Sequence, residues 1–145
     1  SQVLFAQESN NTYSTWDTIE LDTVASAWLI KRFIDSKVTF KFYPKGEFIT
    51  EGIAFDTPDA EFRRMQNQST FETILNKYKI SDPALLEIEK IIYDIEINYW
   101  DKKRIDKSEK VEREVQEIID SITDKNVCLE KSFIYFDNLY RELKE

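Results

Sequence analysis

The stretch LDTVASAWLIKRFID, residues 21–35, decides how the rest of the chain is arranged. Three of its apolar residues recur at a spacing of four and fall on one face of a helix: Ala25, Leu29 and Phe33. Asp22 stands before this face and is expected to cap the helix N-terminus. Lys31 and Arg32 fall in the last turn, where the helix dipole favours cations. The pattern predicts an amphipathic core helix.

Two strands are expected to flank this helix. Residues 13–19 are rich in strand-forming side chains, and residues 38–43 alternate in the manner of a half-buried strand until Pro44 stops them. A strand, a helix and a second strand of these lengths fit a small βαβ unit. Residues 53–56 predict a third short strand.

From about residue 60 the apolar residues have helical periodicity. Ser69 and Glu72 form a capping-box pattern, in which Glu72 is expected to return a hydrogen bond to the cap. Further helix starts are expected at Asp82, Ser108 and about Lys125. The sequence therefore predicts an α+β fold, mostly α, with a small N-terminal βαβ-like sheet packed against about five helices. Residues 15–145 are expected to form one domain, and residues 1–14 a flexible lead-in.

Composition excludes several classes of function. The net charge of −8 disfavours bulk electrostatic binding to nucleic acid or anionic lipid, and no apolar run is long enough for a membrane span. The absence of histidine removes the commonest metal ligand and the usual acid–base residue. We therefore expect no metal, no cofactor and no catalytic residues of the usual types, and we expect Cys128 to be a buried apolar residue.

The N-terminus bears on localisation. Residues 3–6, VLFA, are apolar and precede the polar residues 7–11, as at the end of a signal peptide. A periplasmic or exported protein is one interpretation, and a truncated cytoplasmic chain is the other.

Arginines suggest an oxyanion site. If the third strand brings Arg63 and Arg64 near Arg32, three guanidinium groups could converge with geometry suited to an oxyanion. A solvated charge cluster is the competing interpretation. The candidate ligand-binding residues are Asp22, Trp28, Arg32, Glu61, Arg63, Arg64, Ser69, Glu72 and Asp94.

Asp22 and residues 25–35, ASAWLIKRFID, resemble the signature of the ChrB chromate-resistance family, in its C-terminal domain. Further stretches fit in the same order: residues 53–62, 69–72, 81–85, 91–95 and 135–140. The resemblance covers most of the chain from about Trp16. It implies a bacterial chromate-resistance protein; longer members of the family regulate an efflux operon, and shorter ones have been described as exported.

The chain departs from the family pattern, which commonly has Arg, Cys and His at the positions of Thr23, Ser69 and Tyr93, and a His near Arg63–Arg64. A group of His, Cys and carboxylate side chains of this kind could bind a metal or contact a redox-active oxyanion. The acidic residues that remain would hold only a hard cation, and weakly: Asp22, Glu61, Glu72 and Asp94.

The leading hypothesis is a stand-alone domain that binds or senses a small oxyanion such as chromate, without catalysis. An alternative is an enzyme in which Glu61, Glu72 and Asp94 line a cleft, at least two of them with raised pKa values. A third is a degenerate relative that acts as a protein-interaction module, with an exposed aromatic patch along the last helix.

Overall fold

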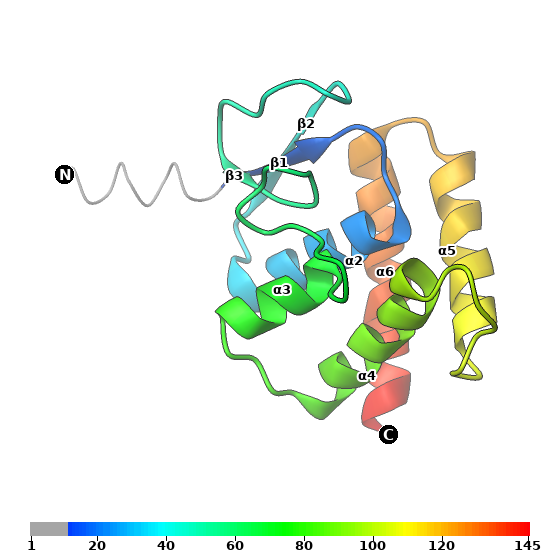
Figure 1. The fold of residues 1–145 in the computed structure, drawn as a ribbon. Coiled ribbons are helices and arrows are strands. Elements are labelled where there is room, and N and C mark those ends of the chain that lie inside the picture. The colour runs from blue at the N-terminus through cyan, green and yellow to red at the C-terminus, as the bar shows by residue number, and fades with distance from the viewer. Residues whose placement is uncertain (1–11) are drawn as a thin grey trace.

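The computed structural model describes residues 12–145, which form a small sheet and five α-helices (Figure 1). The elements are β1 (Thr12–Trp16), α2 (Leu21–Leu29), β2 (Thr39–Tyr43), β3 (Ile53–Ala54), α3 (Thr70–Lys77), α4 (Pro83–Ile92), α5 (Ser108–Ser121) and α6 (Lys125–Lys144). A π-helical turn continues α2 as η1 (Ile30–Ile34) and α4 as η2 (Tyr93–Ile97). The predicted α+β fold, mostly α, is confirmed.

The sheet has the strand order β2-β1-β3, and both pairings are parallel. The β1–α2–β2 segment is therefore the predicted βαβ unit. Because β2 and β3 lie on opposite sides of β1, the strand order reverses at β1. The carboxyl edge of the sheet beside β1 is therefore a topological switch point. β1 begins at Thr12, before the predicted domain boundary, and the rest of the predicted lead-in, residues 1–11, lies outside the described residues.

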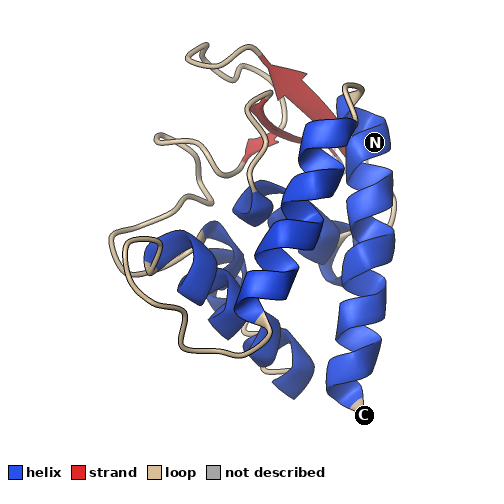
Figure 2. Ribbon diagram, turned by 90° about the vertical axis from the view of Figure 1, so that its right-hand side faces the viewer, coloured by secondary structure: helices blue, strands red, loops and turns tan. Residues whose placement is uncertain are grey.

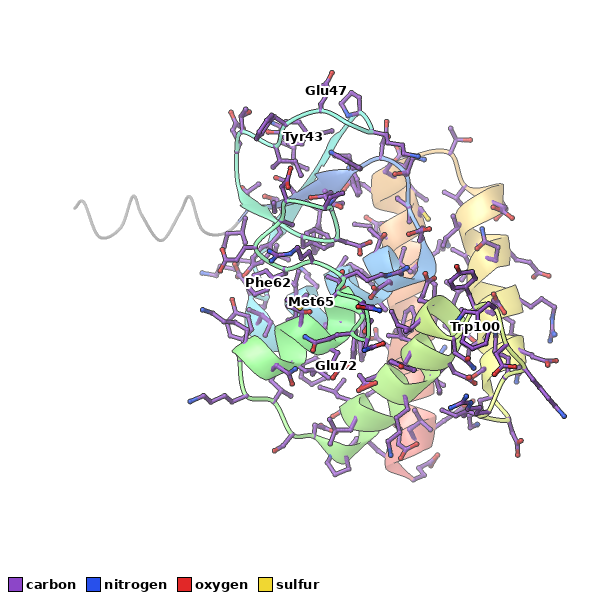
Figure 3. The ribbon with its side chains drawn as sticks, in the orientation of Figure 1. Tyr43, Glu47, Phe62, Met65, Glu72 and Trp100 are labelled. Atoms are coloured by element: carbon purple, nitrogen blue, oxygen red, sulfur yellow. The ribbon has the colours of Figure 1, made fainter. Side chains whose placement is uncertain are left out.

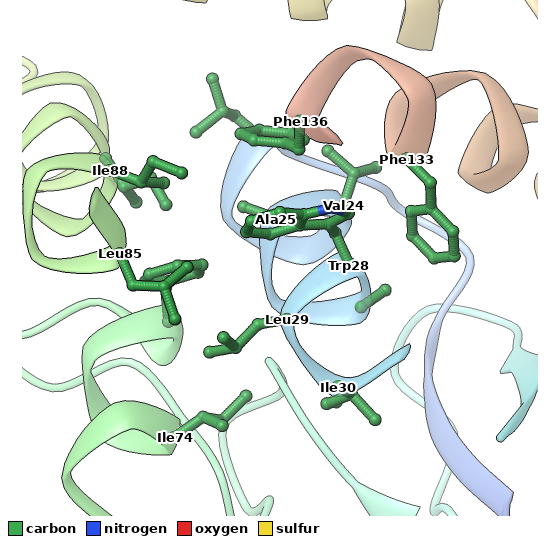
Figure 4. Packing of buried hydrophobic residues seen from close by; sticks show 14 of the residues in the cluster. Val24, Ala25, Trp28, Leu29, Ile30, Ile74, Leu85, Ile88, Phe133 and Phe136 are labelled. Carbon is green, nitrogen blue, oxygen red and sulfur yellow. The ribbon is translucent and has the colours of Figure 1, made fainter. Parts of the chain in front are cut away.

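Helix α2 runs through the centre of the molecule and is buried on every side. Figure 4 shows Trp28 and Leu29 surrounded by side chains of other helices, and the rings of Trp28 and Phe136 lie 5.7 Å apart between their centroids. Burial of such a side chain stabilises a fold by about 1.5–3 kcal/mol. Phe33 of the predicted face lies at the molecular edge, where it is 37% exposed.

The predicted helix starts are partly confirmed. Ser69 caps α3 and accepts a hydrogen bond from the Glu72 amide at 3.1 Å, but among the described residues the Glu72 carboxyl group accepts no hydrogen bond from the backbone amide of Ser69. The N-cap of α2 is Glu20, not Asp22, because the Asp22 carboxylate accepts a hydrogen bond from the first turn of α3. The N-cap of α5 is Lys107, one residue before the predicted cap.

Helices α5 and α6 lie side by side and face the viewer in Figure 2, with the sheet at one end of the pair. The apolar stripe of α6 is core, because Leu129, Phe133 and Phe136 are buried, and Cys128 is buried beside them. The aromatic residues of this stripe therefore do not form the exposed patch expected of an interaction module. Across residues 12–145, no helix is both long and apolar enough to cross a membrane.

Candidate functional site

A buried polar network joins the N-termini of α2 and α3. The Asp22 side chain is fully buried and accepts hydrogen bonds from the backbone amides of Thr70 (2.9 Å) and Phe71 (3.1 Å). These amides have no partner within α3, because the first turn of a helix leaves its N–H groups unsatisfied. Asp22 thus ties the start of α3 to the central helix.

Asp56 supplies the second carboxylate of this network; the residue is partly exposed and was not among the predicted site residues. It follows β3 with a left-handed backbone (φ 56°), and its carboxylate accepts hydrogen bonds from the hydroxyls of Thr23 and Thr70. Burial and the nearby charge of Asp22 raise the pKa of Asp56 to about 7. Its place at the end of the predicted strand 53–56, within the stretch 53–62 that resembles the ChrB family, was the available sequence signal.

Arg64 completes the network from the loop before α3. Its Nη2 atom lies 2.5 Å from Glu96 Oε2 and 3.4 Å from Asp22 Oδ2. One guanidinium group is therefore surrounded by three acidic side chains: Asp22, Asp56 and Glu96. This surplus of negative charge disfavours an oxyanion at Arg64.

The predicted convergence of three arginines is wrong. Arg32 donates through Nε and Nη2 to Asp137 on α6, both at 3.0 Å, whereas Arg63 is exposed and donates to the Ala60 carbonyl oxygen. Each guanidinium group thus has its own partners, supplied by a different part of the fold. The neighbouring sequence could not indicate this, because Asp137 lies more than 100 residues from Arg32 along the chain.

Arg32, on η1, instead lines a cleft with Trp28, a candidate from α2. This α6 cleft has a volume of about 540 Å³ and is lined by Trp28, Arg32, Phe33, Asp137, Tyr140, Arg141, Lys144 and Glu145. The Trp28 indole N–H also donates to Asp137, at 2.8 Å. Burial alone would raise the pKa of Asp137, but the hydrogen bonds from Arg32 and Trp28 outweigh it and lower the pKa.

Two of the acidic candidates, Glu72 and Asp94, share a groove, whereas Glu61 lies outside it. Glu72, labelled in Figure 3, lines a groove of about 390 Å³ with Glu89 and Asp94. Burial and the charge of Glu72 raise the pKa of Glu89 to about 7, and burial raises that of Glu72. Glu61 is exposed on the loop before α3.

The hydrogen bonds of Asp94 indicate a role in stabilising the fold. Its carboxylate accepts hydrogen bonds from the backbone amides of Arg104 and Ile105, each at 2.9 Å from Oδ2. Burial alone would raise the pKa of Asp94, but these bonds and one from Asn98 help to lower it to about 2. Glu61, Glu72 and Asp94 therefore do not form the predicted catalytic cleft, because Glu61 does not line the groove and the pKa of Asp94 is lowered. Within residues 12–145, no cluster of acidic or cysteine side chains is arranged to hold a metal ion.

Comparison with known proteins identifies the family. The model of the ChrB C-terminal domain matches residues 13–143, which is nearly the whole chain. The chain belongs to the ChrB C-terminal domain family. This membership links the ChrB domain to chromate resistance. No curated protein and no solved structure gave a significant match.

The stretches that carry the ChrB resemblance meet at the two sites just described. Asp22, Asp56 and Thr70 come from three of them and form the buried network. The last stretch, residues 135–140, supplies Asp137 and Tyr140 to the α6 cleft. The stretches that resemble the ChrB family thus contain two sets of groups. One set joins α2 to α3, and the other lines a surface cleft.

Proposed function

We propose that this ChrB domain binds a small oxyanion such as chromate in the α6 cleft and does not itself catalyse a reaction. The observation that carries this proposal is the meeting of Arg32, Arg141 and Lys144 in one cleft. A guanidinium group donates directed hydrogen bonds to oxyanions, and an ammonium group adds charge.

The balance of charge favours this cleft over the buried network. The α6 cleft has three cationic side chains and two acidic ones, Asp137 and Glu145. The network has one guanidinium group among three acidic side chains, so an anion there would meet net repulsion. We therefore propose the oxyanion site on the side of α2 that faces α6 rather than at Arg63 and Arg64.

Arg32 is held in position before any anion arrives. Its Nε and Nη2 atoms bind Asp137, and that carboxylate is fixed in turn by the Trp28 indole. The Nη1 atom has no protein partner in the described part of the chain and remains available to an oxygen of the ligand. Arg141 and Lys144 are exposed or half-exposed on the last turns of α6 and can close on the anion.

Isothermal titration with sodium chromate and with sodium sulfate tests this proposal. The double variant Arg141→Gln/Lys144→Gln is preferred to an Arg32 variant, because Arg32 also holds Asp137. We expect the wild type to bind chromate in the millimolar range or tighter. The double variant should lose about tenfold in affinity, which corresponds to about 1.4 kcal/mol.

Arg113→Gln is the matched control, since Arg113 is an exposed cation on α5 that does not line the cleft. It should bind chromate as the wild type does. Absence of wild-type binding at millimolar chromate, or equal affinity of the double variant and the wild type, would overturn the proposal.

A further inference from the structure

A second pocket lies at the carboxyl edge of the sheet, where the strand order reverses. This switch-point pocket has a volume of about 580 Å³. It is lined by the β1–α2 connection (residues 16–20), by Lys45 after β2, and by Asp56 and Pro58 after β3. In open sheets with parallel strands, ligands bind in the crevice outside the carboxyl ends of the strands at such a point.

The pocket carries both signs of charge. Asp17 and Glu20 come from the β1–α2 connection, and Lys45 and Lys125 supply the cations. Neither lysine forms an ion pair with any residue that the structure describes. Asp56 is only partly ionised near neutral pH, because burial and Asp22 raise its pKa to about 7.

One wall of the pocket is apolar. Ile119 and Ile122 at the end of α5 face this space together with Pro58 and Trp16. The Trp16 indole is held by a hydrogen bond from Nε1 to the backbone oxygen of Glu47 at 2.8 Å, so the ring has a fixed orientation (Glu47 is labelled in Figure 3). The pocket thus offers a rigid aromatic surface beside its charged groups.

We propose that the switch-point pocket binds a small zwitterion with an apolar body, of the amino-acid type. Its ammonium group would face Asp17 and Glu20, its carboxylate would face Lys45 and Lys125, and its side chain would contact the apolar wall. Asp17 and Glu20 accept hydrogen bonds from the backbone amides of Lys45 and Thr23. A ligand with only one charge would leave either these acids or the lysines without an oppositely charged partner. This site is separate from the α6 cleft and does not depend on oxyanion binding.

Matched ligands test the proposal on the intact chain. L-leucine and L-phenylalanine are the zwitterionic probes, isocaproate is leucine without its ammonium group, and isoamylamine is leucine without its carboxylate. Binding is followed through the Trp16 indole N–H signal in ¹⁵N–¹H spectra. We expect leucine or phenylalanine to shift this signal at millimolar concentration, and both singly charged analogues of leucine to bind at least about tenfold more weakly than leucine.

Substitutions locate the charged contacts. Lys45→Gln/Lys125→Gln should weaken zwitterion binding about tenfold and leave isoamylamine binding unchanged, whereas Lys131→Gln, an exposed lysine of α6 outside the pocket, should change neither. The proposal is overturned if neither zwitterion moves the Trp16 signal, or if isocaproate or isoamylamine binds as tightly as leucine. Arg141→Gln/Lys144→Gln should leave zwitterion binding intact, so this site and the oxyanion cleft can fail independently.

Discussion

The substitution Asp56→Asn should change how the stability of the domain depends on pH. Asparagine has nearly the same shape as aspartate and tolerates the left-handed backbone at this position better than most residues. It can still accept a hydrogen bond from Thr23 or Thr70, but it carries no charge at any pH. The variant therefore isolates the cost of ionising a partly buried carboxyl group next to Asp22.

The sign and size follow from the raised pKa of Asp56, which moves from 3.8 to about 7 through burial and the charge of Asp22. Between these values the native state keeps a proton that the unfolded chain releases, so the free energy of unfolding falls as pH rises. The slope is about 1.36 kcal/mol per pH unit, which gives a loss of about 3 kcal/mol between about pH 5 and pH 8. Below pH 3.8 this stabilisation is fully present.

Urea denaturation followed by circular dichroism, at about pH 5, 6, 7 and 8, measures this slope. We expect the wild type to lose stability over the range and Asp56→Asn to lose much less, so that the variant is the more stable protein at about pH 8. The control Asp59→Asn removes an exposed carboxylate from the same loop and should follow the wild type. A wild-type stability that rises with pH, or a variant with the wild-type slope, would contradict the reasoning.

Three further predictions use the same denaturation assay. Glu89→Gln should stabilise the domain by about 1 kcal/mol at about pH 8 and by less at pH 5, because the raised pKa of Glu89 lies near 7. The effect is modest because the group is half-exposed. A variant that is more stable than the wild type at pH 5 only would refute this. Asp94→Asn should destabilise the domain by about 2–3 kcal/mol at pH 7, since its carboxylate holds the amides of Arg104 and Ile105, and the exposed Asp101→Asn should cost less. Trp28→Phe should lower the free energy of unfolding by about 2 kcal/mol, because it removes the hydrogen bond from the indole to Asp137. It should also weaken chromate binding, because Asp137 holds Arg32 in position. Unchanged chromate affinity would show that the indole bond does not position Arg32.

The fold could be predicted from the sequence where local chemistry determines it. The periodicity of residues 21–35, the cap at Ser69 and the Asp82–Pro83 start each gave the expected element, because these signals act within a few residues. The prediction for Asp22 was wrong for an instructive reason. A buried aspartate near a helix start can cap its own helix or a neighbouring one, and only tertiary packing decides which.

The candidate site was less accessible to sequence reasoning. Trp28 and Arg32 do share a cleft, but their partner Asp137 comes from the last helix. Asp56 and Glu89 were missed because their raised pKa values arise from burial and from carboxylates on other elements. Such effects depend on distances in space, which the residue order does not contain.

The three tryptophans allow one measurement to test the central claim, oxyanion binding in the α6 cleft. Trp28 lines that cleft, Trp16 lines the switch-point pocket, and Trp100 is 72% exposed on the loop before α5 (Figure 3). The measurement is a chromate titration followed through the three indole N–H signals. Binding in the α6 cleft predicts a saturable shift of the Trp28 signal, with those of Trp16 and Trp100 unchanged. A Trp28 signal that does not move at millimolar chromate, or a shift confined to Trp16 or Trp100, would contradict the assignment of the oxyanion site.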